Sequence, residues 1–415
     1  MTDVTESRHR WAEKFPFLGT NPIDTRQCYS AEHFDLEKEK IFKKVWWQVA
    51  RVEELPKKGS YKVRRLDFAD TSVVLIRGKD DKIRAFHNAC SHRGNKPVKE
   101  TSDWDTYGRA RGLAITCRFH GWVYNAKGEL MLAPEQDKFF GIDPATCGLT
   151  PIACDIWNGF IFINLDPSPS QSLGDYLGDM GDHLSNYDYG SLPYVFKYRA
   201  FLNANWKICC DAFQEAYHAA TIHAGTFPDI FYTAVENVNI AGPHRTSAVC
   251  LNLETMKPTA VSTITSEISE NSITQQRGKK MLPEHVNPTN RPDYAFEMPV
   301  IFPFFMVAIG EGVYFTHIFY PIDKDTCVWE GAQYIRQPAN YRERFAAEHG
   351  QVLQRDAWLE DTETMEDTHA AVRSGAKPIF NLQDEEVLVR HQYHAVKRYI
   401  EAKQDFSGRF SWGDM

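Results

Sequence analysis

The sequence predicts an α+β protein, with a small all-β domain followed by a larger domain in which helices cover an antiparallel sheet. Residues 46–165 consist of short β-rich runs separated by Gly, Asn and Asp. Residues 167–172, PSPSQS, form a Pro/Ser segment suited to a linker, and helical and strand-like stretches alternate irregularly after it. A chain of 415 residues is long enough to bury two hydrophobic cores.

The chain begins with a helical segment, residues 1–45, that we expect to pack against the C-terminal domain. Ala31 to Lys44 carries apolar residues among charges, as an amphipathic helix does, and Ser30 stands at the N-cap position. The predicted organisation is therefore 1–45, 46–165 and 166–415.

The middle domain is predicted to be all-β because its runs are rich in β-branched and aromatic residues. The turns between the runs hold residues that favour reverse turns. The runs are YKVRRL, TSVVLIRG, KIRAFHNAC, LAITC, GWVYNAKGEL and FIFINL.

Three features of the C-terminal domain bear on its chemistry. Asn203 to His223 is dense in helix formers and aromatic residues and is expected to be helical. PFFMVAIGEGVYFTHIFYPI indicates a β-hairpin with Gly310 and Gly312 at its turn. Residues 355–373 and 384–403 are expected to form two further helices.

Composition excludes several classes of partner. The net charge of −8 argues against nucleic acid, which needs a basic face to displace counterions from phosphates. The N-terminal stretch MTDVTESRHRWAEKF is charged throughout and lacks the apolar region of a signal peptide. The most apolar run, residues 299–310, is too short to span a bilayer. We therefore expect a cytoplasmic protein with no membrane partner.

Two half-motifs in the β-rich domain have metal-ligand spacing. Cys90-x-His92 and Cys117-x-x-His120 each supply one thiolate and one imidazole. A zinc ion accepts such a set, but the common zinc patterns pair Cys with Cys and His with His. One of each per loop suits a two-iron cluster in which one iron takes both thiolates and the other takes both histidines.

The boxes CSHRG and CRFHGW resemble the paired ligand boxes of Rieske domains, and WNGFIFINLD resembles their closing strand. The resemblance implies a [2Fe–2S] cluster held by Cys90, His92, Cys117 and His120. The interval between the boxes is longer than in most members of the family. We expect the surplus, DWDTYGRAR at residues 103–111, to be a surface loop.

A second constellation follows in NWKICCDAFQEAYHAATIH. On one helix, Asp211, Glu215 and His218 would share a face, and His223 follows five residues after His218. Two histidines and one carboxylate on Fe(II) leave positions open for O₂ and substrate.

The carboxylate ligand is expected in DAWLEDTETMED, where Asp361 is the first choice and Glu360 and Glu363 are alternatives. A solvated acidic helix face would also explain this stretch. Only the two histidines favour the ligand interpretation.

Together the two motif sets, in this order, resemble the catalytic (alpha) subunit of Rieske non-haem iron oxygenases, the aromatic-ring-hydroxylating family. The resemblance implies a helix-grip-like catalytic domain, mononuclear Fe(II) and O₂ as co-substrate. It also implies a homotrimer in which Glu215 bridges His120 of one subunit to His218 of its neighbour, with Asp211 as the alternative bridge.

The function expected from this resemblance is that of a terminal oxygenase that hydroxylates an aromatic or other hydrophobic substrate. Electrons would come from NAD(P)H through a separate reductase, possibly with a ferredoxin, because no GxGxxG motif opens a βαβ unit in this chain. The alternatives are N- or O-demethylation and, less favoured, an electron carrier without catalysis. The hairpin at 299–320, Phe213 and Phe227 are the expected pocket residues.

Overall fold

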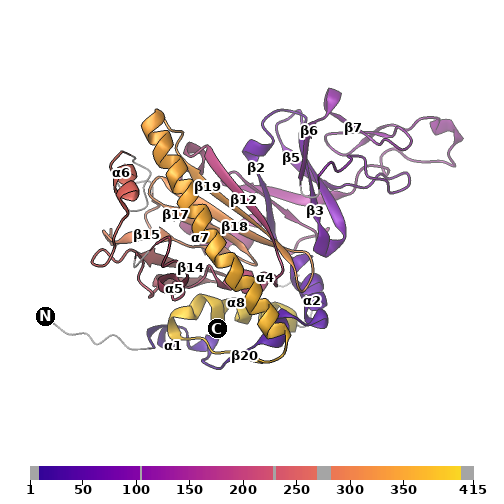
Figure 1. Cartoon of the computed structure of the whole chain (residues 1–415). Helices are drawn as coiled ribbons and strands as arrows, with labels where there is room; N and C mark the ends of the chain where they lie inside the picture. Colours follow the sequence, from indigo (N-terminus) through magenta and orange to yellow (C-terminus); the bar gives the residue numbers. More distant parts are fainter. Residues whose placement is uncertain (1–8, 103–104, 228–229, 269–281, 403–415) are drawn as a thin grey trace. The chain divides into compact units, whose positions relative to one another are not determined.

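The computed structural model describes residues 9–102, 105–227, 230–268 and 282–402. Within them the chain divides into two compact units (Figure 1). One unit comprises residues 38–176, and the other comprises residues up to 37 together with those from 177 onward. The predicted α+β class is confirmed.

The unit 38–176 is all-β, as predicted. Its larger sheet has seven strands in the order β2-β11-β10-β5-β4-β3-β6, and every neighbouring pair is antiparallel. A second sheet has three strands in the order β7-β8-β9. The bounds are β2 Trp47–Arg51, β3 Ser60–Leu66, β4 Thr71–Arg77, β5 Ile83–His87, β6 Asp105–Arg109, β7 Ala114–Thr116, β8 Val123–Asn125, β9 Leu130–Leu132, β10 Pro151–Trp157 and β11 Phe160–Asn164.

Strand β6 corrects the expectation of a surface loop at 103–111, of which 103 and 104 lie outside the described residues. Asp105 to Arg109 pairs with β3 along the edge of the larger sheet. The Asp105 carboxylate is buried there and forms ion pairs with Arg64 at 2.8 Å and Lys62 at 3.3 Å. A polar stretch becomes a strand because its acid neutralises two buried cations of the neighbouring strand.

The other unit is built on an eight-stranded antiparallel sheet in the order β12-β19-β18-β17-β15-β14-β13, with β16 pairing β14 and β17. The predicted hairpin is β17 and β18, closed by Glu311 and Gly312, and Gly312 has φ 71°. The bounds are β12 Tyr194–Leu202, β13 Glu236–Ala241, β14 His244–Cys250, β15 Tyr294–Glu297, β16 Val300–Ile301, β17 Phe305–Gly310, β18 Val313–Pro321 and β19 Cys327–Ile335.

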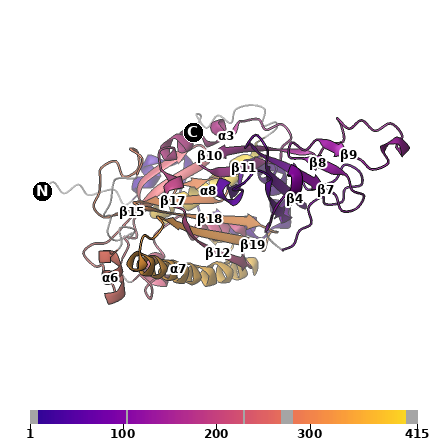
Figure 2. The ribbon, with the colours of Figure 1, turned by 90° about the horizontal axis from the view of Figure 1, so that it is seen from above.

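Helix α7, Tyr341–Arg373, is the longest element and runs along the sheet beside β12 and β19 (Figures 1 and 2). It begins 14 residues before the predicted residue 355, because the Asn340 side chain accepts hydrogen bonds from the backbone N–H groups of Arg342 and Glu343. Its buried residues recur at helical spacing and face the sheet. They are Ala346, Ala347, Ala357, Trp358, Asp361, Met365, His369 and Val372.

The close approach of α7 to the sheet depends on Gly331 in β19. A Cβ atom at this position would lie 3.0 Å from Cζ3 of Trp358, closer than ordinary van der Waals contact. Trp358 also packs edge-to-face on Trp329 of β19, with ring centroids 5.7 Å apart. The pair of tryptophans therefore anchors the middle of α7, next to Asp361.

The single helix expected at 203–223 is wrong. The structure has α4, Trp206–Asp211, then an irregular stretch, then the short α5, Ala219–Ile222. The helix is interrupted where the Glu215 carboxylate accepts the backbone N–H of His218 at 3.1 Å. A side chain that takes a backbone donor competes with the helical hydrogen bond.

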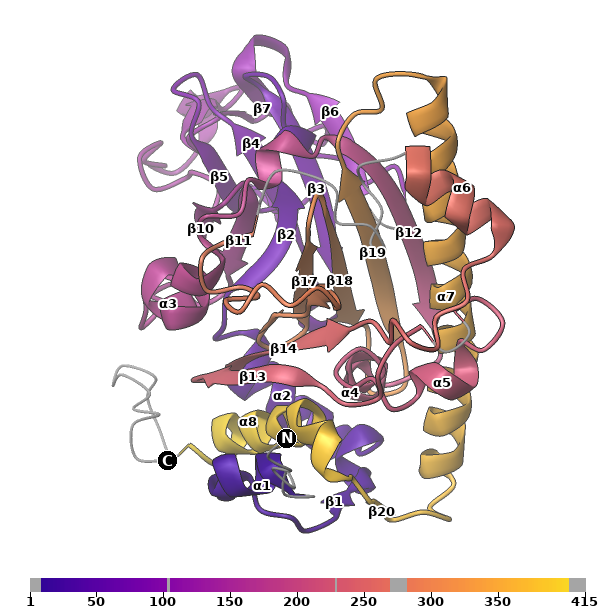
Figure 3. The same ribbon diagram turned by 90° about the vertical axis from the view of Figure 1, so that its left-hand side faces the viewer.

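Helices α1, α2 and α8 lie together below the sheet in the view of Figure 3, whereas α6 packs beside α7. The predicted helix from Ala31 is present as α2, Ala31–Glu37, continued by a turn of π-helix at Lys38–Phe42, and Ser30 Oγ accepts the N–H of His33. The other bounds are α1 Arg10–Lys14, α3 Leu173–Leu184, α6 Ala260–Ile268, α8 Val387–Glu401, and the paired strands β1 Ile23–Asp24 and β20 Ile379–Phe380. None of the helices in the described ranges has the length and apolar character needed to cross a membrane.

Candidate functional site: two metal centres

The loops that carry the two Cys/His half-motifs are built alike. The Cys90 N–H donates to Asn95 and the Cys117 N–H donates to Trp122, so each loop closes on its own cysteine. In each loop a glycine four residues after the cysteine, Gly94 or Gly121, donates its N–H back to the cysteine carbonyl. Both glycines have positive φ, 72° and 74°, which other residues adopt only with strain.

The structure brings the two cysteines of these loops together and the two histidines together. The cysteines are buried in one apolar cluster with Trp122, and the His92 and His120 rings lie with centroids 4.5 Å apart. The His92 ring stacks on Trp122, and its buried Nδ1 has no hydrogen-bond partner among the described residues. A buried imidazole nitrogen without a partner fits a metal ligand.

Each cysteine thiol has a hydrogen-bonding side chain close to its sulfur. The Tyr124 hydroxyl lies 3.0 Å from the Cys90 Sγ, and the Asn95 amide lies 3.6 Å from the Cys117 Sγ. The Tyr124 oxygen also accepts the backbone N–H of Ser91 at 3.0 Å, which fixes its position. Donors to cluster sulfurs raise the reduction potential.

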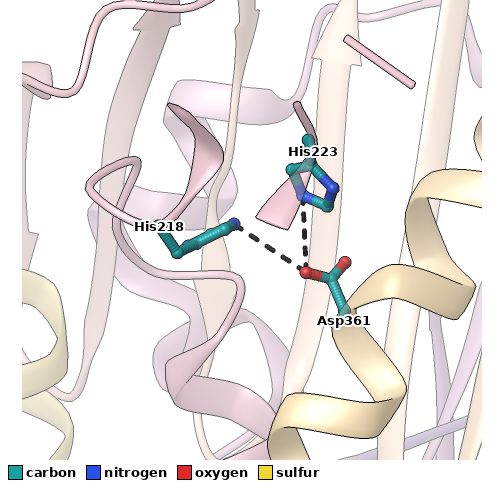
Figure 4. A group of neighbouring side chains, drawn as sticks. All are labelled: His218, His223 and Asp361. Atoms are coloured by element: carbon teal, nitrogen blue, oxygen red, sulfur yellow. Dashed lines mark ion pairs between the residues drawn. The ribbon is translucent and has the colours of Figure 1, made fainter. Parts of the chain in front are cut away.

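The second centre joins His218 and His223 to Asp361 of α7 (Figure 4). One carboxylate oxygen of Asp361 lies 3.4 Å from His223 Nε2 and 3.8 Å from His218 Nε2. One ligand atom from each of the three residues lies within 4.8 Å of the others. The Asp361 side chain is almost fully buried, and this oxygen has no hydrogen-bond donor among the described residues.

Two further carboxylates fix the histidine rings. The Nδ1 of His218 contacts Glu215, and the Nδ1 of His223 lies 2.8 Å from Glu360, which also accepts from the Thr226 hydroxyl. Because each Nδ1–H donates to a carboxylate, each Nε2 is unprotonated and its lone pair is directed toward Asp361. Two imidazoles and one carboxylate in this state form a facial set for Fe(II).

The structure places the three acids that the sequence offered as candidate carboxylate ligands in different surroundings. Asp361 lies between the two Nε2 atoms, Glu360 lies at the opposite nitrogen of His223, and Glu363 is exposed. Burial raises the pKa of Asp361 to about 8. A buried carboxylate with so high a pKa is short of compensating positive charge, which a metal cation supplies.

Asp211 lies apart from this set. Its carboxylate accepts hydrogen bonds from the Tyr393 hydroxyl at 2.6 Å and the Gln392 amide at 2.8 Å, both on α8. Burial raises its pKa to about 8. The broken helix therefore directs Asp211 to α8 and Glu215 to His218.

A cavity of about 130 Å³ opens beside the His218, His223 and Asp361 set. Phe213 and Phe227 line it, as predicted, and the β17–β18 hairpin contributes Phe315 and His317. Sequence reasoning missed the contributions of α7 and of β14 and β15, although the apolar stripe of α7 was a usable signal for Trp358. The further lining residues are mostly apolar: Ala212, Glu215, Ala216, Ala219, Ile230, Phe231, Val249, Leu251, Phe296, Met298, Gln354, Ala357 and Trp358.

Comparison with protein families decides how these centres are to be interpreted. A family model described as the ring hydroxylating alpha subunit (catalytic domain) matches residues 184–402, more than half of the chain. The chain belongs to the ring hydroxylating alpha subunit family. A second family model, the Rieske [2Fe-2S] domain, matches residues 45–151.

Curated relatives of this alpha subunit act on different molecules. The chain is 36% identical over 213 residues to the 2-aminobenzenesulfonate 2,3-dioxygenase subunit alpha of Alcaligenes sp, a match that covers 48% of this chain and 49% of that protein. It is 33% identical over 199 residues to the carnitine monooxygenase oxygenase subunit of Acinetobacter baumannii, covering 47% and 51%. The chain spans about half the length of the curated relatives it matches.

Solved structures share the fold along nearly the whole chain. Naphthalene 1,2-dioxygenase from Rhodococcus sp. superposes with a TM-score of 0.76 at 19% identity, covering 98% of this chain and 100% of that one. The quaternary ammonium Rieske monooxygenase CntA superposes with a TM-score of 0.72 at 20% identity, covering 92% and 97%. At these identities the likeness is one of fold.

The two domain matches imply a Rieske [2Fe–2S] cluster, a mononuclear iron and O₂ as co-substrate. The residues present fit both metal groups. Each loop of the first centre offers one thiol and one imidazole, with an orphaned nitrogen on His92. The second centre offers two bare Nε2 atoms and an orphaned carboxylate oxygen on Asp361.

Proposed function

We propose that this alpha subunit is the terminal oxygenase of a Rieske system, which hydroxylates a compact hydrophobic organic substrate with O₂ and electrons from NAD(P)H. The observation that carries the proposal is that the His218, His223 and Asp361 set faces an apolar cavity in a chain that also has a Rieske domain. A carrier of electrons alone needs neither the second centre nor the cavity.

In this proposal Cys90, His92, Cys117 and His120 hold the cluster, and His218, His223 and Asp361 hold the single iron. When bound, the iron supplies O₂ activation and the cluster supplies electrons. Glu215 and Glu360 keep the proton of each iron-binding histidine on Nδ1 and so orient its ring. The apolar walls exclude water and bring the substrate close to the iron.

The electron path is proposed to cross between subunits of a homotrimer, from His120 of one chain to Glu215 and His218 of its neighbour. His120 is exposed on its own unit, as a residue that meets a partner must be. Glu215 and His218 also line a second cavity, of about 340 Å³, together with Asp211. A separate reductase, with or without a ferredoxin, completes the proposed system in the cytoplasm, where NAD(P)H is available.

The cavity favours a small, uncharged substrate. A cavity of about 150 Å³ holds benzene, so a space of about 130 Å³ suits a single ring once the side chains adjust. Neither Lys nor Arg occurs among the described residues that line it. A sulfonate or carboxylate group would therefore lack a cationic partner there.

Demethylation of an amine or a methoxy compound is the second candidate. Aromatic rings surround much of the cavity, and such rings bind quaternary ammonium groups by cation–π attraction. Carnitine monooxygenase and glycine betaine monooxygenase subunits are also among the curated relatives.

A substrate screen tests the proposal. Purified protein with a surrogate reductase and NADH is offered single-ring arenes, methoxyarenes and trimethylamines under ¹⁸O₂, and products are identified by mass spectrometry. Label in a ring-hydroxylated product supports the first candidate, and formaldehyde release supports the second. Protein with both metal centres filled that oxidises none of these compounds would contradict both candidates.

A further inference from the structure

His317 of β18 carries a polar atom that the apolar cavity leaves without a partner. The side chain is fully buried and lines the cavity, and its Nε2 has no hydrogen-bond partner among the described residues. Phe213 stacks on the ring with centroids 4.3 Å apart, and Trp358 packs against its edge at 5.0 Å. A buried polar atom without a partner costs free energy, so its presence beside a binding cavity calls for a ligand.

The other ring nitrogen determines what Nε2 can do. The Trp329 indole N–H donates to His317 Nδ1 at 3.1 Å. An indole nitrogen is only ever a donor, so Nδ1 must be the acceptor and the ring hydrogen must be on Nε2. Burial lowers the pKa of His317 to about 3, so the ring is neutral at any working pH. Nε2 is therefore a neutral N–H donor.

The position of Trp329 also limits where this donor is directed. Trp329 packs against α7 and β12 and is not part of the cavity wall. Because Nδ1 is turned toward Trp329, the free edge of the ring, which carries Nε2, is the polar part of His317 available to the cavity.

We propose that His317 determines substrate specificity by donating a hydrogen bond from Nε2 to an uncharged acceptor atom of the substrate. The inference rests on the proposed function, in which this cavity takes the organic substrate. It narrows the substrate class to compact, mainly apolar molecules that carry one neutral acceptor, such as a carbonyl, ether, hydroxyl or nitrile.

Two benzene derivatives with linear substituents of the same length differ only in whether they can accept this hydrogen bond. Benzonitrile ends in an acceptor nitrogen, whereas ethynylbenzene ends in a C–H group. Their dissociation constants are measured by anaerobic titration calorimetry on the iron-loaded holoenzyme, and the same pair is measured on His317→Phe. The ratio of the two dissociation constants is compared between wild type and His317→Phe. The difference in hydration between the ligands is the same for both proteins and therefore cancels.

His317→Phe is expected to weaken benzonitrile binding roughly three- to tenfold relative to ethynylbenzene, the range of one neutral hydrogen bond. His317→Gln, which keeps an N–H donor, should retain part of the preference. Leu251→Val, a change at an apolar wall position, should affect both ligands alike. Iron content and melting temperature verify that each variant is folded, and His317→Leu replaces His317→Phe if the latter is not.

Equal changes for both ligands in His317→Phe would overturn the inference, since the Nε2–H would then be satisfied by solvent. Failure of either ligand to bind wild-type holoenzyme would also overturn it, by removing the assumed substrate cavity. Because the readout is binding without turnover, loss of the proposed oxygenase activity and loss of the His317 contact are observed separately.

Discussion

At the scale of single residues, His218 and His223, which we propose as iron ligands, differ in the carboxylate that orients each ring. Glu215 belongs to the same irregular stretch as His218, whereas Glu360 reaches His223 from α7. Only Glu215 also lines the second cavity, where we propose that the neighbouring subunit delivers its electron. Both carboxylates therefore orient a histidine ring, but only Glu215 is proposed to carry electrons between subunits.

Glu215→Gln is expected to keep both metal centres and slow product formation by roughly 10- to 100-fold, the range of changes beside metal ligands. The amide oxygen can still accept the Nδ1–H of His218, so the ring stays oriented, but the negative charge on the electron path is lost. Iron analysis and single-turnover product formation measure the two effects.

Glu360→Gln is the control, because it makes the same change beside His223 and away from the proposed path. We expect it to weaken iron binding more than it slows turnover of the iron-loaded fraction. Normal turnover by iron-loaded Glu215→Gln would show that Glu215 is not the bridge.

A pH-dependent contribution to stability comes from His183, whose Nε2 lies 2.6 Å from the buried carboxylate of Glu297. Burial alone would lower the pKa of His183, but the hydrogen bond and charge of Glu297 outweigh it and raise the pKa. A raised folded-state pKa stabilises the fold fully below about pH 6.5, the unfolded value, and this contribution is lost as pH rises through the folded pKa.

His183→Gln should therefore lower the free energy of unfolding by roughly 1.5–3 kcal/mol at pH 6 and by less at pH 9. Urea denaturation at several pH values gives the two curves. Parallel curves for wild type and variant would contradict the assignment, as would a larger loss at pH 9.

At the scale of elements, α7 shows why sequence and structure agree on the site but not on the helix. Trp358, Asp361 and Met365 follow helical spacing, but a solvated acidic helix face would also have this spacing, and only the two histidines identified Asp361 as a ligand. The first turns carry a start signal, Asn340 followed by Glu343, which the prediction did not use, and Gly350 is a poor helix former within the same helix. Packing against the sheet, and the cap at Asn340, form them nonetheless.

The start of α7 gives a prediction at this scale. Asn340→Ala removes the side-chain acceptor of two backbone N–H groups and should lower the free energy of unfolding by about 1 kcal/mol. Asn340→Asp keeps an acceptor and should change it little. Denaturation with urea compares the three proteins, and equal loss in both variants would contradict capping as the cause.

The short strands of the Rieske domain and the β17–β18 hairpin were predictable because β-branched and aromatic residues fill the strands and turn-forming residues separate them. The break between α4 and α5 was not, because it depends on Glu215 accepting a backbone N–H in competition with the helix. Strand β6 was missed for a similar reason, since the ion pairs of Asp105 with Arg64 and Lys62 join distant parts of the sequence. The ligand motifs were visible because metal chemistry restricts residue type and spacing.

At the scale of the whole molecule, we propose that each cluster serves the iron of a neighbouring subunit. This assignment distinguishes a trimer that is needed for catalysis from one that only adds stability. Neither a variant without the cluster nor a variant without the iron would turn over alone, but the two could complement each other in a mixed trimer.

His120→Ala and His223→Ala chains, co-expressed with different tags and purified as mixed trimers, should regain about a third of wild-type activity per chain. In a ring of three that contains both variants, one chain keeps its iron site and also receives electrons from a neighbour that keeps its cluster. Trimers of either variant alone are the controls. No recovery in verified mixed trimers would place the electron path within a single chain.

We propose that His218, His223 and Asp361 hold an iron distinct from the cluster. Iron and acid-labile sulfide per chain, measured on wild type and on His223→Ala, test it most directly. We predict about three irons and two sulfides in wild type, and about two irons, two sulfides and an unchanged reduced-cluster EPR signal in the variant. Two irons in fully loaded wild type, or three in the variant, would contradict the claim.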